Sequence, residues 1–180
     1  MTVLKSTQKL FILICAAVLF ASCAVNVRTV YDHDANFDSY KTFCWMDGCE
    51  FKVAGPEYLK DSMIRDHIKL AIISELKRKG LTQNLDNPDL LVGFNITMKD
   101  EKAIIYHHSP DMPFYRPVDN DSDVIPYLKG TLVLGMADKK QSKIVWESFA
   151  VSYLDMNPDF SEEEVLKGIK LVLKKFPPKK

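Results

Sequence analysis

Two adjacent histidines and three nearby aspartates are the side chains best suited to holding a metal ion. His107 and His108 open a polar stretch, residues 107–126, and its acidic run contains Asp119, Asp121 and Asp123. Imidazole nitrogens bind transition metals and carboxylates bind calcium, so the composition suits either class of ion. The run lacks the glycine and the downstream glutamate of a calcium-binding EF-hand loop. We therefore interpret the stretch as a solvated loop that could bind a partner.

Patterns that mark a catalytic centre are missing from the rest of the sequence. No Gly-x-Ser-x-Gly motif occurs, and the seven glycines are scattered singly rather than gathered in a phosphate-binding loop. Asp32-His33-Asp34 could orient a histidine between two carboxylates, but no nucleophile motif accompanies it. We expect a protein with no cofactor and no enzymatic activity. A hydrolase or metal-dependent enzyme built on His107 and His108 is the alternative.

Two cysteines five positions apart could form a disulfide bond. Cys44 and Cys49 enclose the pair Asp47-Gly48, which favours a tight turn. An exported protein meets an oxidising compartment, where such a bond forms and persists. Spacing alone does not give the distance between the two α-carbons, so a bridge and a pair of free thiols both remain open.

Cys23 is the cysteine whose surroundings predict a definite modification. Two lysines precede an apolar run over residues 10–20, and Ala21 and Ser22 then lead into the cysteine. The run has 11 residues, which suits a secretory signal and is too short for a permanent membrane span. Small residues before a cysteine are typical of a bacterial lipoprotein signal, in which the thiol is acylated. An ordinary cleaved signal and an uncleaved anchor are the alternatives.

Acylation at Cys23 would divide the chain after residue 22. Residues 1–22 form the predicted signal peptide, and residues 23–180 form a single lipid-anchored domain. Several acyl chains on one cysteine make attachment effectively permanent, because each buried methylene contributes about 0.8 kcal/mol. Ala24 rather than aspartate follows the cysteine, which favours the outer membrane. We expect a bacterial cell-envelope protein that is held by membrane lipid and faces the periplasm.

The composition of the mature chain argues against a nucleic-acid partner. Removing residues 1–22 takes away two lysines and no acidic residue, which leaves 158 residues with a net charge of −2. Such a chain lacks the basic patch that neutralises phosphates. Its length and its apolar content, 47% in the full sequence, are those of one globular domain with a hydrophobic core.

Alternating apolar residues predict a series of strands. The candidate strands cover residues 24–30, 41–46, 90–98, 103–106, 127–137 and 144–154. The charged segment from Lys99 to Lys102 is expected to turn between the third and fourth of them. The apolar side changes along residues 144–154, which predicts either two covered faces or a bulge near Glu147-Ser148.

Two further segments have the period of an amphipathic helix. The first covers residues 56–79, and Gly80 suits its C-cap. The second follows Ser161, which forms a candidate capping box with Glu164, and ends before Pro177. Their apolar stripes are Ile64, Ile68, Ala71, Ile72 and Leu76 in the first and Val165, Ile169, Val172 and Phe176 in the second. The expected fold is α+β, a mostly antiparallel sheet of about five to six strands with two amphipathic helices packed on one face.

Several short phrases, taken in order, resemble one known family. They are Phe37-Asp38-Ser39-Tyr40-Lys41-Thr42-Phe43 followed by Trp45, Lys79-Gly80, Pro88-Asp89-Leu90-Leu91-Val92, Gly130-Thr131-Leu132, Asp138, Val145-Trp146 and Phe176-Pro177-Pro178. Over about residues 26–178 the chain resembles the bacterial lipoprotein family catalogued as domain of unknown function 4136. The resemblance implies one α+β domain behind a lipoprotein signal and carries over no catalytic residue. Cys44 departs from the pattern, so a Cys44–Cys49 bridge would be particular to this chain.

These features together predict a membrane-anchored envelope protein that acts as a non-enzymatic binding or structural module. The candidate partners are an envelope protein, a lipid or a cell-wall component, held by a loop or by an open face of the sheet. Residues 107–126 are the first surface to test. A subunit of a larger assembly is a further hypothesis.

Overall fold

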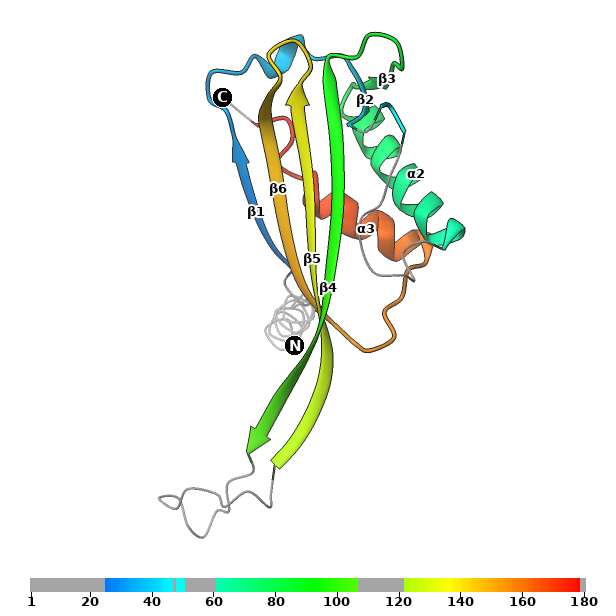
Figure 1. The fold of residues 1–180 in the computed structure, drawn as a ribbon, viewed down its shortest axis with the longest axis vertical. Helices are drawn as coiled ribbons and strands as arrows, with labels where there is room; N and C mark the ends of the chain where they lie inside the picture. The colour runs from blue at the N-terminus through cyan, green and yellow to red at the C-terminus, as the bar shows by residue number, and fades with distance from the viewer. Residues whose placement is uncertain (1–24, 47, 51–60, 107–121, 179–180) are drawn as a thin grey trace, which may run out of the picture.

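The chain folds into one mixed β-sheet covered by two helices. The computed structural model describes residues 25–46, 48–50, 61–106 and 122–178. Its strands are β1 (Asn26–Tyr31), β2 (Thr42–Trp45), β3 (Thr82–Gln83), β4 (Leu90–Tyr106), β5 (Ser122–Asp138) and β6 (Lys143–Leu154). Its helices are α2 (Ser62–Arg78) and α3 (Glu162–Val172), and a 3-10 turn, η1 (Phe37–Ser39), follows β1. Figure 1 shows the elongated sheet with both helices beside its upper part.

The order of strands in the sheet is β1-β6-β5-β4-β2-β3. The pairs β1–β6, β6–β5 and β5–β4 are antiparallel, whereas β2 lies parallel to both β4 and β3. The parallel pairs arise because the chain crosses over through α2 before it re-enters the sheet, so β3 and β4 run in the direction of β2. The predicted α+β class and the strand number are confirmed, but the sheet is mixed. The two-residue strand β3 was not predicted.

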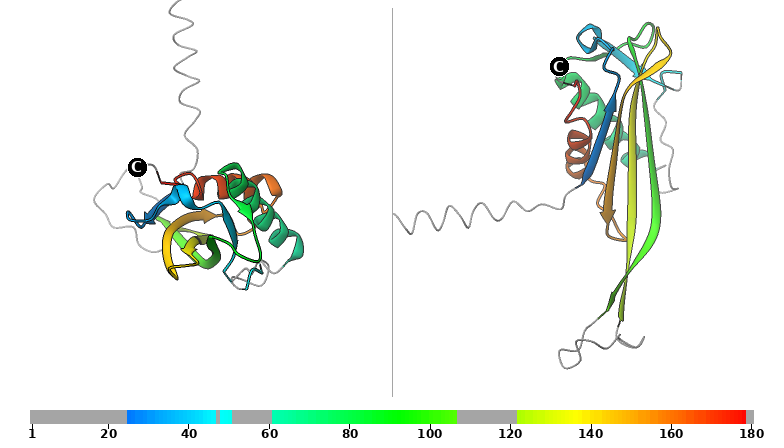
Figure 2. Two further views of the ribbon diagram at one scale, coloured as in Figure 1. Left: turned by 90° about the horizontal axis from the view of Figure 1, so that it is seen from above. Right: turned by 90° about the vertical axis from the view of Figure 1, so that its left-hand side faces the viewer.

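Both helices lie on one face of the sheet (Figure 2). Helix α2 begins after Asp61, whose carboxylate accepts hydrogen bonds from the amides of Met63 (2.8 Å) and Ile64 (3.4 Å). It ends before Gly80, which adopts φ +89° as the predicted C-cap. The helix was predicted from residue 56, and residues 56–60 lie outside the described residues. Within the described part of the chain, no helix is long and apolar enough to cross a membrane.

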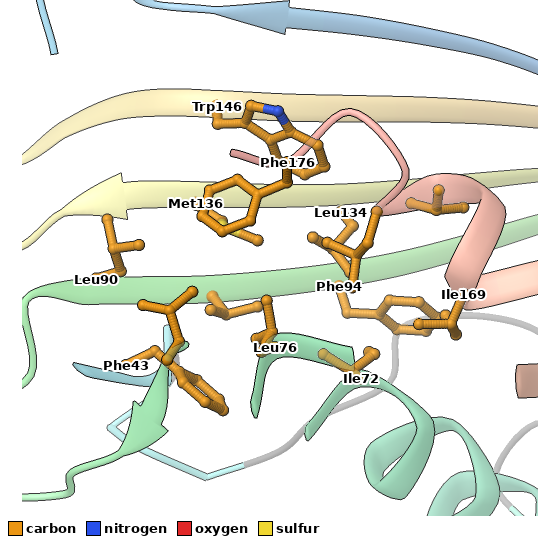
Figure 3. Packing of buried hydrophobic residues seen from close by; sticks show 14 of the residues in the cluster. Phe43, Ile72, Leu76, Leu90, Phe94, Leu134, Met136, Trp146, Ile169 and Phe176 are labelled. Carbon is orange, nitrogen blue, oxygen red and sulfur yellow. The ribbon is translucent and has the colours of Figure 1, made fainter. Parts of the chain in front are cut away.

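The core lies between the helices and the upper half of the sheet. Alternate residues of β4, from Leu90 to Phe94, point toward Ile72 and Leu76 of α2 (Figure 3). Ile169 of α3 packs at the lower side of this cluster. The predicted stripes of both helices therefore face the sheet, except that Ile64 and Val165 are only partly buried.

The predicted turn at Lys99–Lys102 is wrong, because β4 continues through it to Tyr106. These charged residues pair across to β5, where Glu101 lies opposite Tyr127 and Lys99 opposite Lys129. A long partner strand thus keeps the segment extended despite its polarity. Residues 122–126, predicted as loop, belong to β5. Pro126 is accepted there because β6 ends earlier and leaves an open strand edge.

Two local predictions near β6 and α3 also need correction. The register shift lies between Met136 and Ala137 of β5, opposite Ile144 and Trp146, and not at Glu147-Ser148. Val145 is therefore the extra residue of a bulge, which turns Trp146 into the core. Ser161 precedes α3 but makes no capping hydrogen bond from its side chain. Its hydroxyl is instead occupied by Asp159, as described below.

Candidate functional site

The side chains that the sequence singled out for metal chemistry are not gathered by the described structure. Outside the described residues lie His107, His108, Asp119 and Asp121, and also Cys23, the predicted site of acylation. Asp123 is exposed in β5, opposite Ile105 of β4. Over residues 25–46, 48–50, 61–106 and 122–178, no group of three or more His, Cys, Asp or Glu side chains is placed to hold a metal ion.

Cys44 and Cys49 form a disulfide bond, with their α-carbons 5.0 Å apart. Cys44 is fully buried in β2, and the chain reverses after it through Gly48 and Cys49, both at φ +64°. The bond closes a short loop at the end of the strand. We assign it a structural role.

A cavity of about 560 Å³ lies between α3 and the lower half of the sheet. Ile96 of β4 and Leu132 of β5 contribute to its floor, and Val165 of α3 contributes to its wall. Ser152, opposite Gly130, adds a hydroxyl-bearing side chain to a lining that is otherwise apolar away from the rim. The interior therefore offers few hydrogen bonds, and its volume falls within the range of small-ligand sites, about 300–1,000 Å³.

Two glycines create space in this cavity. Gly168 lies on the lining side of α3, and a Cβ placed there would meet nothing within 4 Å. Gly130 of β5 lets Met98 lie flat over the strand, since a Cβ there would come within 3.0 Å of the Met98 sulfur. A larger residue at Gly168 would thus fill the cavity, whereas one at Gly130 would push a flexible methionine aside.

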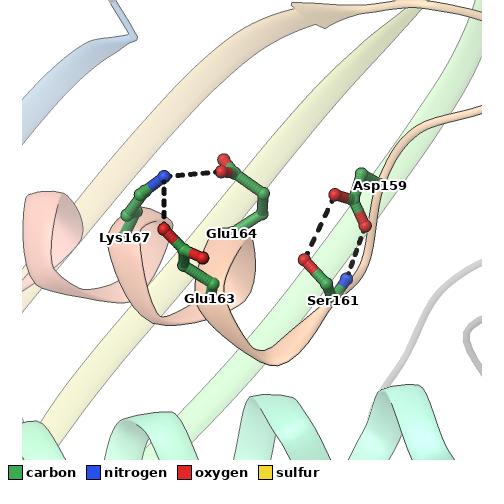
Figure 4. Close-up of polar contacts among 5 residues, drawn as sticks. All are labelled: Asp159, Ser161, Glu163, Glu164 and Lys167. Atoms are coloured by element: carbon green, nitrogen blue, oxygen red, sulfur yellow. Dashed lines mark hydrogen bonds and ion pairs between the residues drawn. The ribbon is translucent and has the colours of Figure 1, made fainter.

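Charged side chains form the rim of the cavity beside the start of α3 (Figure 4). Lys167 Nζ lies 2.7 Å from Glu164 Oε1 and 3.1 Å from Glu163 Oε1, and these hydrogen bonds raise the pKa of Lys167. The Asp159 carboxylate accepts hydrogen bonds from the amide (2.8 Å) and hydroxyl (3.1 Å) of Ser161. The lining thus includes two carboxylates, of Asp159 and Glu164, and one ammonium, so the rim carries excess negative charge.

Val25 also lines the cavity, at the end where the chain enters the fold. Cys23 precedes it by two residues in the sequence and lies outside the described residues. Sequence analysis missed the cavity. The only signal was the small residue Gly168 inside an otherwise regular helical stripe.

The opposite end of the sheet is closed by partly buried polar contacts. Asp89 Oδ2 accepts from the amides of Lys41 and Thr42 (both 2.9 Å) and from the Thr42 hydroxyl (2.8 Å), which together hold the pKa of Asp89 below its usual value. Tyr40 donates to Asp138 Oδ2 at 2.8 Å. Burial and this hydrogen bond raise the pKa of Tyr40 to about 12, so it remains a donor.

Aromatic rings complete this end. Phe176 packs edge-on against Trp146 and Phe37, with ring centroids 5.3 Å and 6.0 Å away. The Lys79 ammonium donates to the carbonyl oxygen of Phe176, and burial lowers the pKa of Lys79. We call this set the closed end, defined by Tyr40, Thr42, Asp89, Asp138 and Phe176.

The residues of the closed end lie within segments that mark a family. The family model named "Domain of unknown function (DUF4136)" matches residues 27–178. The chain belongs to the DUF4136 family. The match covers nearly all of the described fold, and the family assigns no activity. No curated protein is significantly similar in sequence.

Solved structures share the fold of this DUF4136 domain at low sequence identity. A PDZ domain protein from Parabacteroides distasonis aligns with a TM-score of 0.56 and 19% identity over 87% of this chain, which spans only 36% of that protein. A PelC dodecamer from Paraburkholderia phytofirmans aligns with a TM-score of 0.49, 9% identity, and coverage of 87% and 100%. A putative neuraminyllactose-binding hemagglutinin homolog from Helicobacter pylori aligns with a TM-score of 0.44, 12% identity, and coverage of 83% and 93%. The first of these likenesses supports the architecture alone.

Proposed function

We propose that this protein is a lipid-anchored cell-envelope lipoprotein whose domain is a non-enzymatic binding module for an acyl chain. The observation that carries the proposal is the largely apolar cavity of about 560 Å³ beneath α3. Placing an acyl chain there removes apolar surface from water on both sides, which favours binding by about 25 cal/mol per Å². The interior offers few polar partners, so a sugar or a peptide backbone would lose most of its hydrogen bonds on entering.

The charged rim supports a selection among lipids. Asp159 and Glu164 outnumber Lys167 on the lining, so a free fatty-acid carboxylate at the mouth would be repelled. An uncharged ester or a cationic headgroup would meet no such repulsion. The ligand class we propose is therefore an acyl chain with a neutral or amine-bearing head.

The sequence before the fold supports the anchor. The signal-like segment ends at Cys23, and acylation of this residue would hold the domain at a membrane, for which we propose the outer membrane facing the periplasm. Val25 lies at the cavity, so the proposed anchor would keep the cavity next to a supply of lipid chains.

Binding of a fluorescent monoacylglycerol to the purified full-length protein tests the cavity. Gly168→Leu places a side chain in the open space and should abolish binding, because nothing needs to move to admit it. Lys170→Leu adds a leucine to the exposed side of the same helix and should bind like the wild type. Equal binding by both variants would reject the cavity as the ligand site. The rim is tested by a fatty acid of the same chain length, which should bind more weakly.

Incorporation of labelled palmitate in cells tests the anchor. The wild type should carry the label and float with membranes, and Cys23→Ser should lose both properties. Unchanged flotation of an unlabelled Cys23→Ser protein would show that the thiol is not the anchor.

A further inference from the structure

Strands β4 and β5 continue beyond the rest of the sheet as a two-stranded projection (Figure 1). Strand β6 ends at Leu154, opposite Leu128, so residues 101–106 and 122–127 pair only with each other among the described residues. We call this projection the ribbon. A pair of strands without a third partner or a covering helix gains little stability on its own. The stability of the domain does not explain the length of the ribbon, so we look for a contact outside the domain.

The ribbon carries large apolar side chains in water. Ile104 and Val124 are cross-strand partners on one face, and Ile105 and Ile125 lie on the other. Their exposed fractions are 54%, 55%, 44% and 46%. Exposed apolar side chains gathered on one projecting element mark a contact surface rather than ordinary surface scatter.

The geometry of the proposed anchor limits what this surface can contact. Strand β1 begins at Asn26, in register with Val151, Thr131 and, across β5, Thr97. From this level β4 continues for nine more residues to its end at Tyr106 in the ribbon, which is about 30 Å at 3.3 Å per residue. Cys23 lies three residues before Asn26 and can extend at most about 11 Å from it. The ribbon projects from the end of the sheet at which β1 begins (Figure 1). The two lengths above make its reach longer than that of the tether.

We propose that the ribbon is a second membrane contact, which seats its isoleucine and valine side chains in the lipid surface beside the anchor. This inference rests on the proposed lipid anchor at Cys23. An anchored domain that stood upright would drive the ribbon into the bilayer, and one that leaned over would lay it on the surface. In both orientations the ribbon is the element nearest to lipid.

The side chains along the ribbon set the depth of the contact. At its base Tyr127 donates to Glu101 (2.8 Å) and packs against Tyr153, whose ring also faces Lys129. Tyrosines and lysines of this kind favour the boundary between lipid and water. Beyond them come the four apolar side chains, and also Asp123, whose charge opposes deep burial. Strand edges without partners cannot enter the hydrocarbon core either. The ribbon therefore lies at the level of the headgroups.

A site-specific probe in the acylated full-length protein tests this contact. Ile104→Cys is labelled with nitrobenzoxadiazole and the protein is reconstituted in phosphatidylethanolamine–phosphatidylglycerol vesicles. The control is Gln141→Cys, an exposed position in the turn at the other end of the sheet. Spin-labelled lipid should quench the probe at 104 and leave the probe at 141 unaffected. Adding Val124→Asp to the labelled protein should reduce the quenching at 104, while circular dichroism reports that the fold is retained.

The other outcomes reject the inference in distinguishable ways. Quenching at 104 by aqueous iodide but not by lipid, in protein that floats with the vesicles, would reject the ribbon contact and leave the anchor intact. A disulfide cross-link between two copies of the unlabelled Ile104→Cys protein, without lipid quenching of the labelled one, would make the partner a second copy of the chain. Failure of the wild type to float would reject the anchor and the ribbon contact together.

Discussion

The two ends of the sheet differ in how they treat polar and apolar groups. At the closed end, carboxylates and a tyrosine hydroxyl are paired inside the protein, and Phe176 is 3% exposed between two other rings. At the other end, which we call the open end, the cavity and the ribbon leave apolar surface uncovered and hold their charges at the rim. At the closed end the polar groups are paired within the protein. At the open end the apolar surface stays exposed unless a ligand or partner covers it.

The polar contacts of the closed end come from segments in which the sequence resembles its family. The recognisable phrases of the sequence supply Tyr40, Thr42, Asp89 and Asp138, which hold two strands and two connections together. None of these side chains lines the cavity. The phrase Gly130-Thr131-Leu132 does line it, so the likeness to the DUF4136 family extends from the closed end to the cavity.

Removing the central ring of the closed end should have the largest effect. Phe176→Ala should lower the free energy of unfolding by about 4 kcal/mol, because it leaves a void between Trp146 and Phe37. Leu171→Ala, at the mouth of the cavity, should cost less than about 1 kcal/mol because Leu171 is already 43% exposed. Urea unfolding followed by tryptophan fluorescence measures both. Equal losses would show that the two ends do not differ in packing.

Removing the carboxylate of Asp89 should cause the second-largest loss of stability. Asp89→Ala removes the acceptor of three hydrogen bonds and should cost about 2–3 kcal/mol in the same measurement. Asp86→Ala changes an exposed aspartate three residues earlier and should stay within about 0.5 kcal/mol of the wild type. If the two variants were alike, these polar contacts would not be what closes this end.

Acid should weaken the closed end through its paired carboxylates. The Lys41 and Thr42 amides and the Thr42 hydroxyl lower the pKa of Asp89. Burial opposes ionisation of Asp138, but hydrogen bonds from the Gln141 amide and the Tyr40 hydroxyl outweigh it and lower the pKa of this group as well. Lowered pKa values stabilise the folded state above the ordinary value of 3.8, and this stability is lost as the pH falls below it.

A series of urea midpoints from near-neutral to strongly acidic pH measures this loss. Asp89→Asn should be less stable than the wild type near neutrality and should show a shallower decline in acid, since one of the titrating groups is gone. Gly168→Leu should keep the full decline, because it changes only the open end. A wild-type midpoint that did not change through acid would contradict the assignment.

The smallest effect should be a gain in stability at the open end. Gly168→Ala removes a glycine from the interior of α3 and adds a methyl group to open space, so it should raise the free energy of unfolding by about 1 kcal/mol. Gly130→Ala has no such space and should be neutral or unfavourable, since Met98 must move. A loss of stability in the Gly168 variant would mean that the cavity has no room beside the helix.

The sequence predicts those parts of the fold that local patterns encode. Ile68 and Leu76 recur at helical spacing, and Gly80 ends their helix, because period and cap are properties of a short stretch of chain. The extension of β4 through Lys99–Lys102 could not be predicted in this way. The charged residues favour a turn locally. They stay extended because they pair with β5, a strand that comes much later in the sequence.

The cavity was equally hidden from the sequence. It depends on how far α3 stands from β4, β5 and β6, and no run of residues encodes that separation. Val25 reads as one more strand residue, and Gly168 as a tolerated break in a helix. The apolar residues 103–106 were predicted to be a strand, but as a partner of residues 90–98. They pair instead with residues 122–125, so their exposure was not predicted.

The position of β1 at the edge of the sheet has a consequence for the order of folding. Its partner is β6, and the pairing of Asn26 with Val151 joins residues from nearly opposite ends of the domain. Contacts so distant along the chain form late, because the intervening loop must first be closed. Strand β1 thus cannot pair with β6 until almost the whole polypeptide is available for folding. A nascent molecule would spend that interval with this strand free, the state most exposed to capture by a chaperone or to mispairing with a neighbour.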